Sequence, residues 1–133
     1  MNIISLYSSL LLFMYFILSI NTIRMRRKNQ IAIGHNECPE MLRAIRAHSN
    51  FAEYVPLCLF AIYLIESQGA NPYFIHFLGS LLLIGRISHA YGISQINENF
   101  KFRVTGMALT FTSLLSSSLY LIVSYFKSLL DYQ

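Results

Sequence analysis

The sequence predicts an all-α integral membrane protein whose chain crosses the bilayer as a four-helix bundle. The chain has 133 residues, of which 55% are hydrophobic and only 12% are charged, and its mean hydropathy is +0.49. Ordinary soluble domains carry about 25% charged residues, and a soluble chain this short has too little interior to bury so many large apolar side chains. Long apolar segments separated by short polar connections fill nearly the whole sequence, so we expect a single domain over residues 1–133.

The first helix is predicted over about residues 1–27. Residues 1–23 contain no charged side chain, and at about 1.5 Å per residue they would span roughly 34 Å, enough to cross the hydrocarbon core. A basic cluster then ends the span, formed by Arg24, Arg26, Arg27 and Lys28. A secretory signal peptide has its positive charges before the apolar segment. Here they follow it, so we expect a retained membrane anchor.

The second helix is predicted over about residues 40–67. Pro39 precedes it, and proline is favoured in the first turn of a helix. Pro56 lies inside the predicted helix and removes one backbone hydrogen bond. Membrane helices tolerate such a proline when their neighbours satisfy the freed carbonyl group. The polar turn SQGANP, residues 67–72, then ends the helix.

The third and fourth helices are predicted over about residues 72–93 and 102–127. Asn71 is a suitable cap for the third helix because its side chain can accept from the first free backbone N–H groups. The fourth helix is predicted because residues 104–126 carry no charge. Small residues recur along it at roughly helical spacing, and we expect them to allow close helix packing: Gly106, Thr110, Ser113 and Ser117.

The positions of the basic residues predict the topology. Nine of the ten lysines and arginines lie in regions 24–46 and 86–103, whereas the turn at 67–72 has none. Cytoplasmic connections of membrane proteins carry the excess of positive charge. We therefore expect both basic regions on the cytoplasmic side and both termini on the other side. The short connections and the lack of a recognisable targeting peptide predict a bacterial inner membrane. Nucleic-acid binding is disfavoured because the basic residues flank apolar spans.

A polar stripe on the second helix is the strongest candidate for a site. Arg43, Arg46, Asn50 and Glu53 fall within an arc of roughly 80° on a helix. Charges at membrane depth are costly and usually face a bundle interior or a wet cavity. The surplus positive charge favours an anionic ligand. A structural ion pair, between Arg46 and Glu53 or with a neighbouring helix, is the open alternative.

Further polar residues are expected near the cytoplasmic level of this stripe. Arg86 and His89 are three residues apart and share one face of the third helix, and Tyr91 follows them. Arg103 opens the fourth helix, and Arg24 ends the first. The rest of the basic cluster is more simply explained by contact with anionic lipid. The cysteines, Cys38 and Cys58, have no metal-binding spacing, so no metal site is predicted.

Three sequence segments stand out together: RAIRAHSNFAEYVP (residues 43–56), RISHAYG (86–92) and RVTGM (103–107). They resemble the MAPEG family, the membrane-associated proteins in eicosanoid and glutathione metabolism. The resemblance covers nearly the whole chain, and its segments occur in the family's order. It implies a homotrimer of four-helix subunits, with glutathione as co-substrate bound between neighbours near the cytoplasmic side.

The resemblance also implies roles for individual residues. Arg103 matches the arginine held near the glutathione sulfur and is the catalytic candidate. The residues expected to bind glutathione are Arg24, Arg46, Asn50, Glu53, His89 and Tyr91. The sequence departs from other members at three places. Ser49 replaces a basic contact, Val104 replaces a serine, and Ile93 stands where some members have the tyrosine for which Tyr91 is the candidate here.

Three functions remain open from the sequence. The first is a glutathione-dependent membrane enzyme, a transferase or peroxidase that acts on a lipophilic second substrate. The second is a non-catalytic glutathione-binding or scaffold protein of the same fold. The third, a small drug-efflux pump, is disfavoured because such pumps need an ionisable residue inside the first helix, and residues 1–23 have none.

Overall fold

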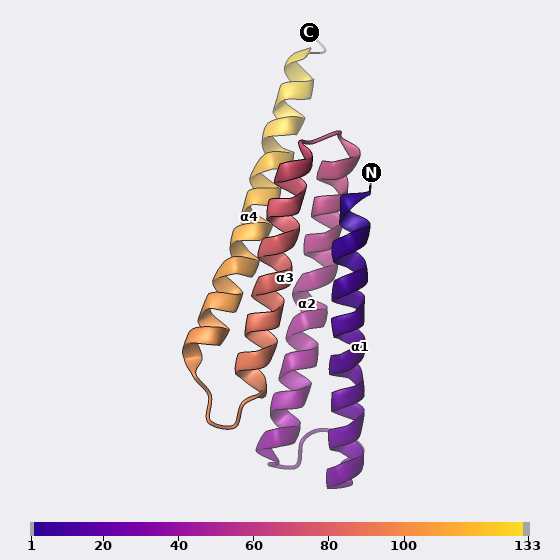
Figure 1. Ribbon diagram of the computed structural model, residues 1–133, viewed down its shortest axis with the longest axis vertical. Helices are drawn as coiled ribbons and strands as arrows, with labels where there is room; N and C mark the ends of the chain where they lie inside the picture. Colours follow the sequence, from indigo (N-terminus) through magenta and orange to yellow (C-terminus); the bar gives the residue numbers. More distant parts are fainter. Residues whose placement is uncertain (1, 132–133) are drawn as a thin grey trace.

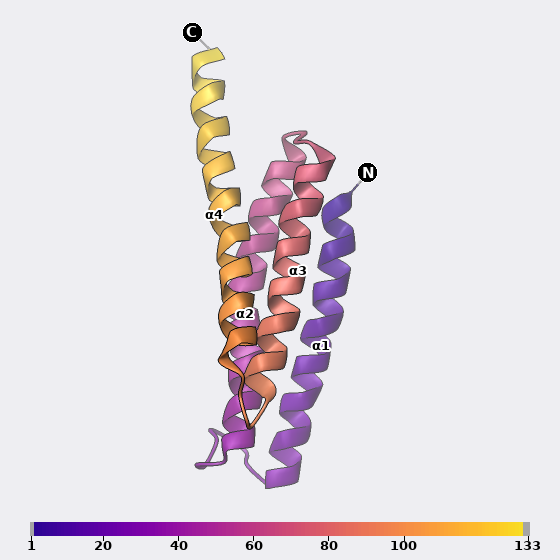
Figure 2. The same cartoon turned by 60° about the vertical axis from the view of Figure 1, so that its left-hand side comes forward.

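The computed structural model describes residues 2–131 and consists of four antiparallel α-helices joined by short connections (Figure 1). The helices are α1 (Ile3–Asn29), α2 (Pro39–Ser67), α3 (Pro72–Ser94) and α4 (Phe100–Asp131). The predicted all-α four-helix bundle is therefore confirmed. Helix α4 is the longest and extends beyond the predicted 102–127 at both ends. Its C-terminal turns project past the rest of the bundle (Figures 1 and 2).

Capping contacts explain where three of the helices begin. The Glu66 carboxylate at the end of α2 accepts hydrogen bonds from the backbone N–H groups of Ile3, at 2.6 Å, and Ile4, at 3.2 Å. It thereby satisfies free donors at the start of α1. Asn71 caps α3 by accepting from the Tyr73 N–H at 2.9 Å, as the sequence predicted. Asn99 caps α4 in the same way, accepting from the Lys101 N–H at 3.1 Å.

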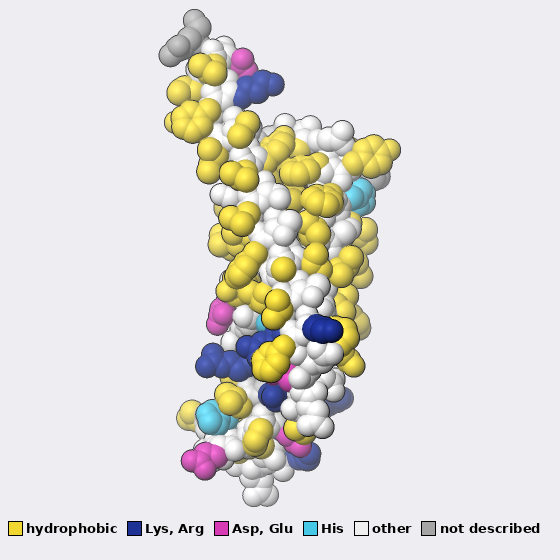
Figure 3. Space-filling model, turned by 90° about the vertical axis from the view of Figure 1, so that its left-hand side faces the viewer, with side chains coloured by type: hydrophobic (Ala, Val, Ile, Leu, Met, Phe, Trp, Pro, Cys, Tyr) yellow, Lys and Arg dark blue, Asp and Glu magenta, His cyan; other side chains and the backbone are white. Residues whose placement is uncertain are grey.

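Helices α2 and α3 form the centre of the bundle, and α1 and α4 flank them. Helix α1 packs on α2 and α3, α4 packs on α3 and α2, and within the described chain α1 and α4 do not pack on each other. Helices α1 and α4 are each long and apolar enough to cross a membrane. Their outward side chains are largely apolar and exposed, and Figure 3 shows many apolar side chains over the upper part of one face. This surface suits contact with lipid.

Small residues bring α3 and α4 into close contact. A Cβ atom added to Gly85 would lie 2.8 Å from the Gly106 carbonyl oxygen, and one added to Gly106 would lie 2.5 Å from the His89 backbone nitrogen. Ser113 is fully buried and donates to the Leu78 carbonyl at 3.0 Å. The expectation that small residues of the fourth helix serve packing is confirmed. This contact fixes the start of α4 beside the end of α3.

The two ends of the bundle differ in charge. Both termini and the turn between α2 and α3 lie at one end, and the connections 30–38 and 95–99 lie at the other (Figure 1). In Figure 3 the basic side chains gather around the second end, apart from one near the C-terminus of α4. The basic end is where the polar stripe of α2 meets α3 and α4.

Candidate functional site

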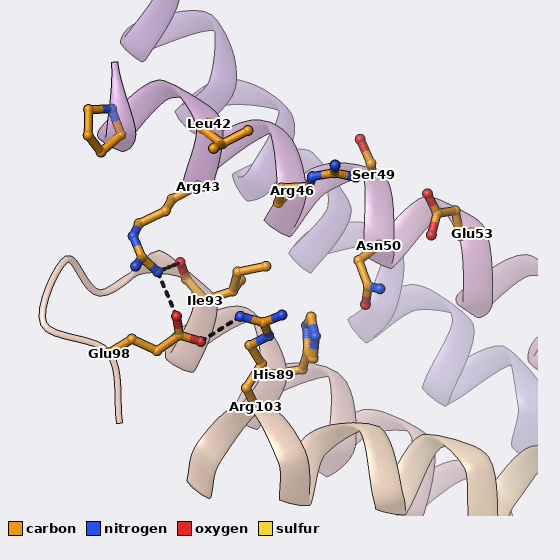
Figure 4. A pocket seen from close by; sticks show the side chains of 11 residues that line it. Leu42, Arg43, Arg46, Ser49, Asn50, Glu53, His89, Ile93, Glu98 and Arg103 are labelled. Atoms are coloured by element: carbon orange, nitrogen blue, oxygen red, sulfur yellow. Dashed lines mark hydrogen bonds and ion pairs between the residues drawn. The ribbon is translucent and has the colours of Figure 1, made fainter. Parts of the chain in front are cut away.

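A cavity of about 500 Å³ opens between α2, α3 and α4 at the basic end of the bundle (Figure 4). Its volume falls within the range of about 300–1,000 Å³ usual for small-molecule sites. The residues that line it come from all three helices and from the connection 95–99: Pro39, Leu42, Arg43, Arg46, Ser49, Asn50, Glu53, His89, Ile93, Glu98 and Arg103. The lining is therefore rich in charge.

The α2 side of the cavity is the predicted polar stripe. All four of its members line the cavity, because their spacing repeats with the turn of the helix. Arg46 and Glu53 are exposed, and among residues 2–131 no hydrogen bond or ion pair joins either of them to another side chain. The alternative of an internal ion pair between these two residues is thus not realised in the described chain.

A buried arginine supports the cavity from behind. Arg86 of α3 is fully buried, and its Nη2 atom donates to Asn50 Oδ1 at 2.7 Å and lies 3.0 Å from His89 Nδ1. Its guanidinium carbon also lies 5.9 Å from the ring centroids of both Phe51 and Tyr54. Because arginine can only donate, Nδ1 of His89 must accept, which leaves the ring proton on Nε2. Arg86 therefore fixes the orientation of two cavity residues.

An acidic residue closes the other side of the cavity. Glu98 accepts from Arg43 Nη1 at 3.0 Å through one carboxylate oxygen and from Arg103 Nη1 at 2.9 Å through the other (Figure 4). Arg43 also donates to the Ile93 carbonyl at 3.1 Å. The hydrogen bond from Arg103, reinforced by Arg43, holds the pKa of the Glu98 carboxyl below its usual value. Glu98 thus connects α2 to the start of α4.

Five of the seven candidate residues line the cavity, namely Arg46, Asn50, Glu53, His89 and Arg103. The other two lie elsewhere in the single chain. Arg24 is exposed near the end of α1, which does not pack on α4. Tyr91 is also exposed, and its ring packs edge-on against Phe102 at 5.2 Å.

The helical register explains the position of Tyr91. It follows His89 by two residues, about 200° around the helix, so the two side chains point in nearly opposite directions. Ile93 follows His89 by four residues and lines the cavity. The position at which some family members carry a tyrosine is therefore apolar here.

Sequence reasoning did not place Glu98 in the site. Glu98 is the only acidic residue in region 86–103. A single carboxylate in an otherwise basic connection was the signal that could have identified it. Arg86 was assigned to the His89 face, but its burial and its contact with Asn50 depend on how α2 and α3 face each other.

Comparison with known proteins identifies the family. A sequence model of the MAPEG family matches residues 4–123, which include nearly all of the four-helix bundle. The chain is 36% identical over 107 residues to the inner membrane protein YecN of Escherichia coli strain K12, with 80% of this chain and 79% of that protein covered. YecN of Escherichia coli O6:H1 strain CFT073 matches to the same extent. The chain is an integral membrane protein that belongs to the MAPEG family.

Proposed function

We propose that this protein is a glutathione-dependent membrane enzyme, acting as a glutathione transferase, a peroxidase, or both, on lipophilic electrophiles. One observation carries the proposal. Arg46 and Glu53 line the same cavity without a protein partner among residues 2–131, and Arg103 lines its other side. Ionisable residues within membrane-spanning segments usually mark a functional site, and a ligand that carries both signs of charge would pair with both Arg46 and Glu53.

The charges of glutathione match the charges of the cavity. Glutathione has two carboxylates, one ammonium group and one thiol. Arg43 and Arg46 suit the carboxylates because a guanidinium group can pair with a carboxylate through two hydrogen bonds. Glu53 suits the ammonium group. Arg103 suits the thiol, since a neighbouring cation lowers a thiol pKa and favours the nucleophilic thiolate.

The reaction then needs no nucleophile from the protein. In conjugation, the thiolate sulfur forms a bond to an electrophilic carbon, the leaving group departs with its bonding electrons, and the thiol proton passes to solvent. In peroxide reduction, two glutathione molecules are oxidised to their disulfide, and the hydroperoxide is reduced to an alcohol and water. The lipophilic partner would enter from the bilayer, for which the exposed apolar side chains of the helices are suited.

We further propose a homotrimer in a bacterial inner membrane, with the basic end in the cytoplasm and both termini on the other side. Family membership and the basic connections support this arrangement. Glutathione would bind where the cavity of one subunit meets its neighbour. Arg24 and Tyr91, which are exposed in the single chain, would be available to such a neighbour.

A non-catalytic glutathione-binding protein of the same fold is the second candidate. The observation that favours it is the ion pair between Arg103 and Glu98, which already occupies the cation needed to stabilise a thiolate. Binding without thiolate formation and without turnover would support this candidate over the enzyme.

Calorimetry and turnover test the proposal on purified protein in detergent. Glutathione is titrated into the protein, and conjugation of 1-chloro-2,4-dinitrobenzene is then followed by its absorbance. We expect saturable binding and a conjugation rate above the rate in detergent alone. A protein that binds no glutathione at millimolar concentration would contradict both candidates.

A further inference from the structure

Glu98 differs from the other carboxylate of the cavity in its surroundings. The side chain of Glu98 is only 7% exposed and contacts an arginine with each of its two oxygens. Glu53, in contrast, is exposed and has no ionic partner among residues 2–131. One carboxylate is therefore already used within the chain, and the other is available to a ligand.

The two arginines held by Glu98 remain partly accessible. The side chain of Arg103 is 41% exposed and that of Arg43 is 26% exposed. Each donates to Glu98 through its Nη1 atom alone. The remaining N–H groups of Arg103 form no hydrogen bond with the part of the protein that the structure describes. A ligand can therefore reach Arg103 while Glu98 stays in contact with it, or after Glu98 has moved away.

Glu98 lies on a connection whose contacts with the neighbouring helix ends do not involve the Glu98 side chain. It belongs to the five-residue connection 95–99, whereas the caps that fix the neighbouring helices come from other residues. Asn99 caps α4, and the backbone N–H of Gln95 donates to the Gly92 carbonyl at the end of α3. Loss of the Glu98 ion pairs would leave both of these contacts in place.

The net charge of the cavity indicates whether Glu98 strengthens or weakens the binding of an anionic ligand. The cavity is lined by three arginines and two glutamates, so its formal charge is one positive unit, and without the Glu98 charge it would be two. Glutathione carries one net negative charge at neutral pH. Like charges brought close together in a partly desolvated site repel each other. Glu98 should therefore weaken the binding of an anionic ligand.

We propose that Glu98 is an internal counter-ion that competes with the bound anion for Arg103, and so sets both the affinity of the cavity for anionic ligands and the ease of thiolate formation. The identity of the ligand as glutathione rests on the function proposed above. The competition itself rests on the two ion pairs. A residue that only positioned Arg103 would have the opposite effect, because its loss would weaken binding.

The test compares Glu98→Gln with a matched control. Glu40→Gln removes the same charge at the same end of the bundle, from an exposed ion pair with Lys28 outside the cavity. Glutathione is titrated by calorimetry into each full-length protein in detergent, after circular dichroism has shown an unchanged helix content. We expect Glu98→Gln to bind glutathione about tenfold more tightly, a change of ~1.4 kcal/mol, and Glu40→Gln to match the wild type.

Thiolate absorbance in the ultraviolet gives a second readout. In Glu98→Gln the thiolate of bound glutathione should form at a pH lower by about half a unit to one unit, because no carboxylate opposes it. Glu98→Asp keeps the charge on a shorter side chain, so its affinity for glutathione should lie between that of the wild type and that of Glu98→Gln. Should Glu98→Gln not fold, a folded Glu98→Asp that binds no more tightly than the wild type overturns the proposal.

The outcomes separate this inference from the proposed function. Glutathione binding to Glu98→Gln that is equal to or weaker than wild-type binding overturns the counter-ion role and leaves the proposed function standing. Glutathione binding to Glu98→Gln but not to the wild type supports the counter-ion role and contradicts the proposed function of the natural protein. Binding to neither protein overturns both.

Discussion

The Nη2 atom of Arg86 donates a hydrogen bond to Oδ1 of Asn50 over 2.7 Å and so joins the centre of α3 to the α2 wall of the cavity. The guanidinium group is fully buried, and its Nε atom has no partner among the described residues. A charged arginine that is buried against neutral side chains lowers the stability of the fold unless its hydrogen bonds are retained. The walls of the cavity and the stability of the bundle therefore depend on the same side chain.

Arg86→Ala should destabilise the protein. The substitution leaves a cavity, removes the hydrogen bonds of a charged group to Asn50, His89 and the Met107 sulfur, and leaves Asn50 and His89 without this donor. We expect a loss of about 2–4 kcal/mol, measured as a lower melting temperature in detergent. Arg27→Ala, at an exposed position on α1, is the control and should leave the melting temperature unchanged. Equal melting temperatures for the two variants would contradict the role given to Arg86.

Arg46→Ala and Glu53→Ala should affect binding and not stability. Both side chains are exposed and have no ionic partner among residues 2–131, so their removal costs the fold little. Each should weaken glutathione binding by about 2–5 kcal/mol if its contact with the ligand is desolvated. Calorimetry measures the affinity for glutathione and a thermal melt measures stability, so the two methods together distinguish an effect on binding from an effect on the fold. Full affinity in either variant would show that the α2 stripe does not hold the ligand.

Gly106→Ala should force α3 and α4 apart. Alanine is intrinsically the better helix former by about 1 kcal/mol, but its Cβ atom would lie 2.5 Å from the His89 nitrogen and 2.6 Å from the Gly85 oxygen. Backbone atoms cannot move aside as a side chain can, so we expect a net loss of about 1–3 kcal/mol. Thr105→Ala, one residue away on the exposed side of α4, should melt like the wild type. A more stable Gly106→Ala would contradict the close packing of these helices.

The ion pairs of Glu98 should make stability depend on acidity. Arg103 and Arg43 lower the pKa of Glu98 in the folded protein below 4.5, the ordinary value for a glutamate. The ion pairs of Glu98 therefore stabilise the fold fully at any pH above 4.5. This stabilisation is lost as the pH falls below 4.5 and Glu98 becomes protonated. The other titratable or charged side chains that line the cavity with Glu98 are Arg46, Glu53 and His89.

Melting temperatures measured between about pH 6 and pH 3 test this dependence. The wild type should lose more stability over that range than Glu98→Gln does, because only the wild type loses the charge of Glu98 and its ion pairs. Parallel curves for the two proteins would show that the ion pairs contribute nothing to the fold.

Sequence patterns predicted features within one helix more completely than the pairings between elements. The α2 stripe follows from helical periodicity alone, and Asn71 and Pro72 marked the start of α3. The Asn99 cap, which starts α4 at Phe100, is also local and could have been recognised. The pairing of Glu98 with Arg43 and Arg103 depends on the rotation of α2 against α4, which no sequence spacing records.

Tyr91 and Arg24 show the limit of inference from resemblance. The register of α3 turns Tyr91 away from the cavity and brings Ile93 to it, which residue spacing could have predicted. Arg24 lies at the expected end of the bundle, but α1 packs on the side away from α4. Within the single chain Arg24 therefore does not line the cavity.

The proposed function requires that the cavity binds glutathione and ionises its thiol. The ultraviolet difference spectrum on adding glutathione, with S-methylglutathione as the control that cannot form a thiolate, tests it most directly. At a pH where free glutathione is a thiol, we predict a thiolate band for the wild-type protein and its loss in Arg103→Ala. A wild-type protein that is saturated with glutathione and shows no thiolate band would contradict the claim.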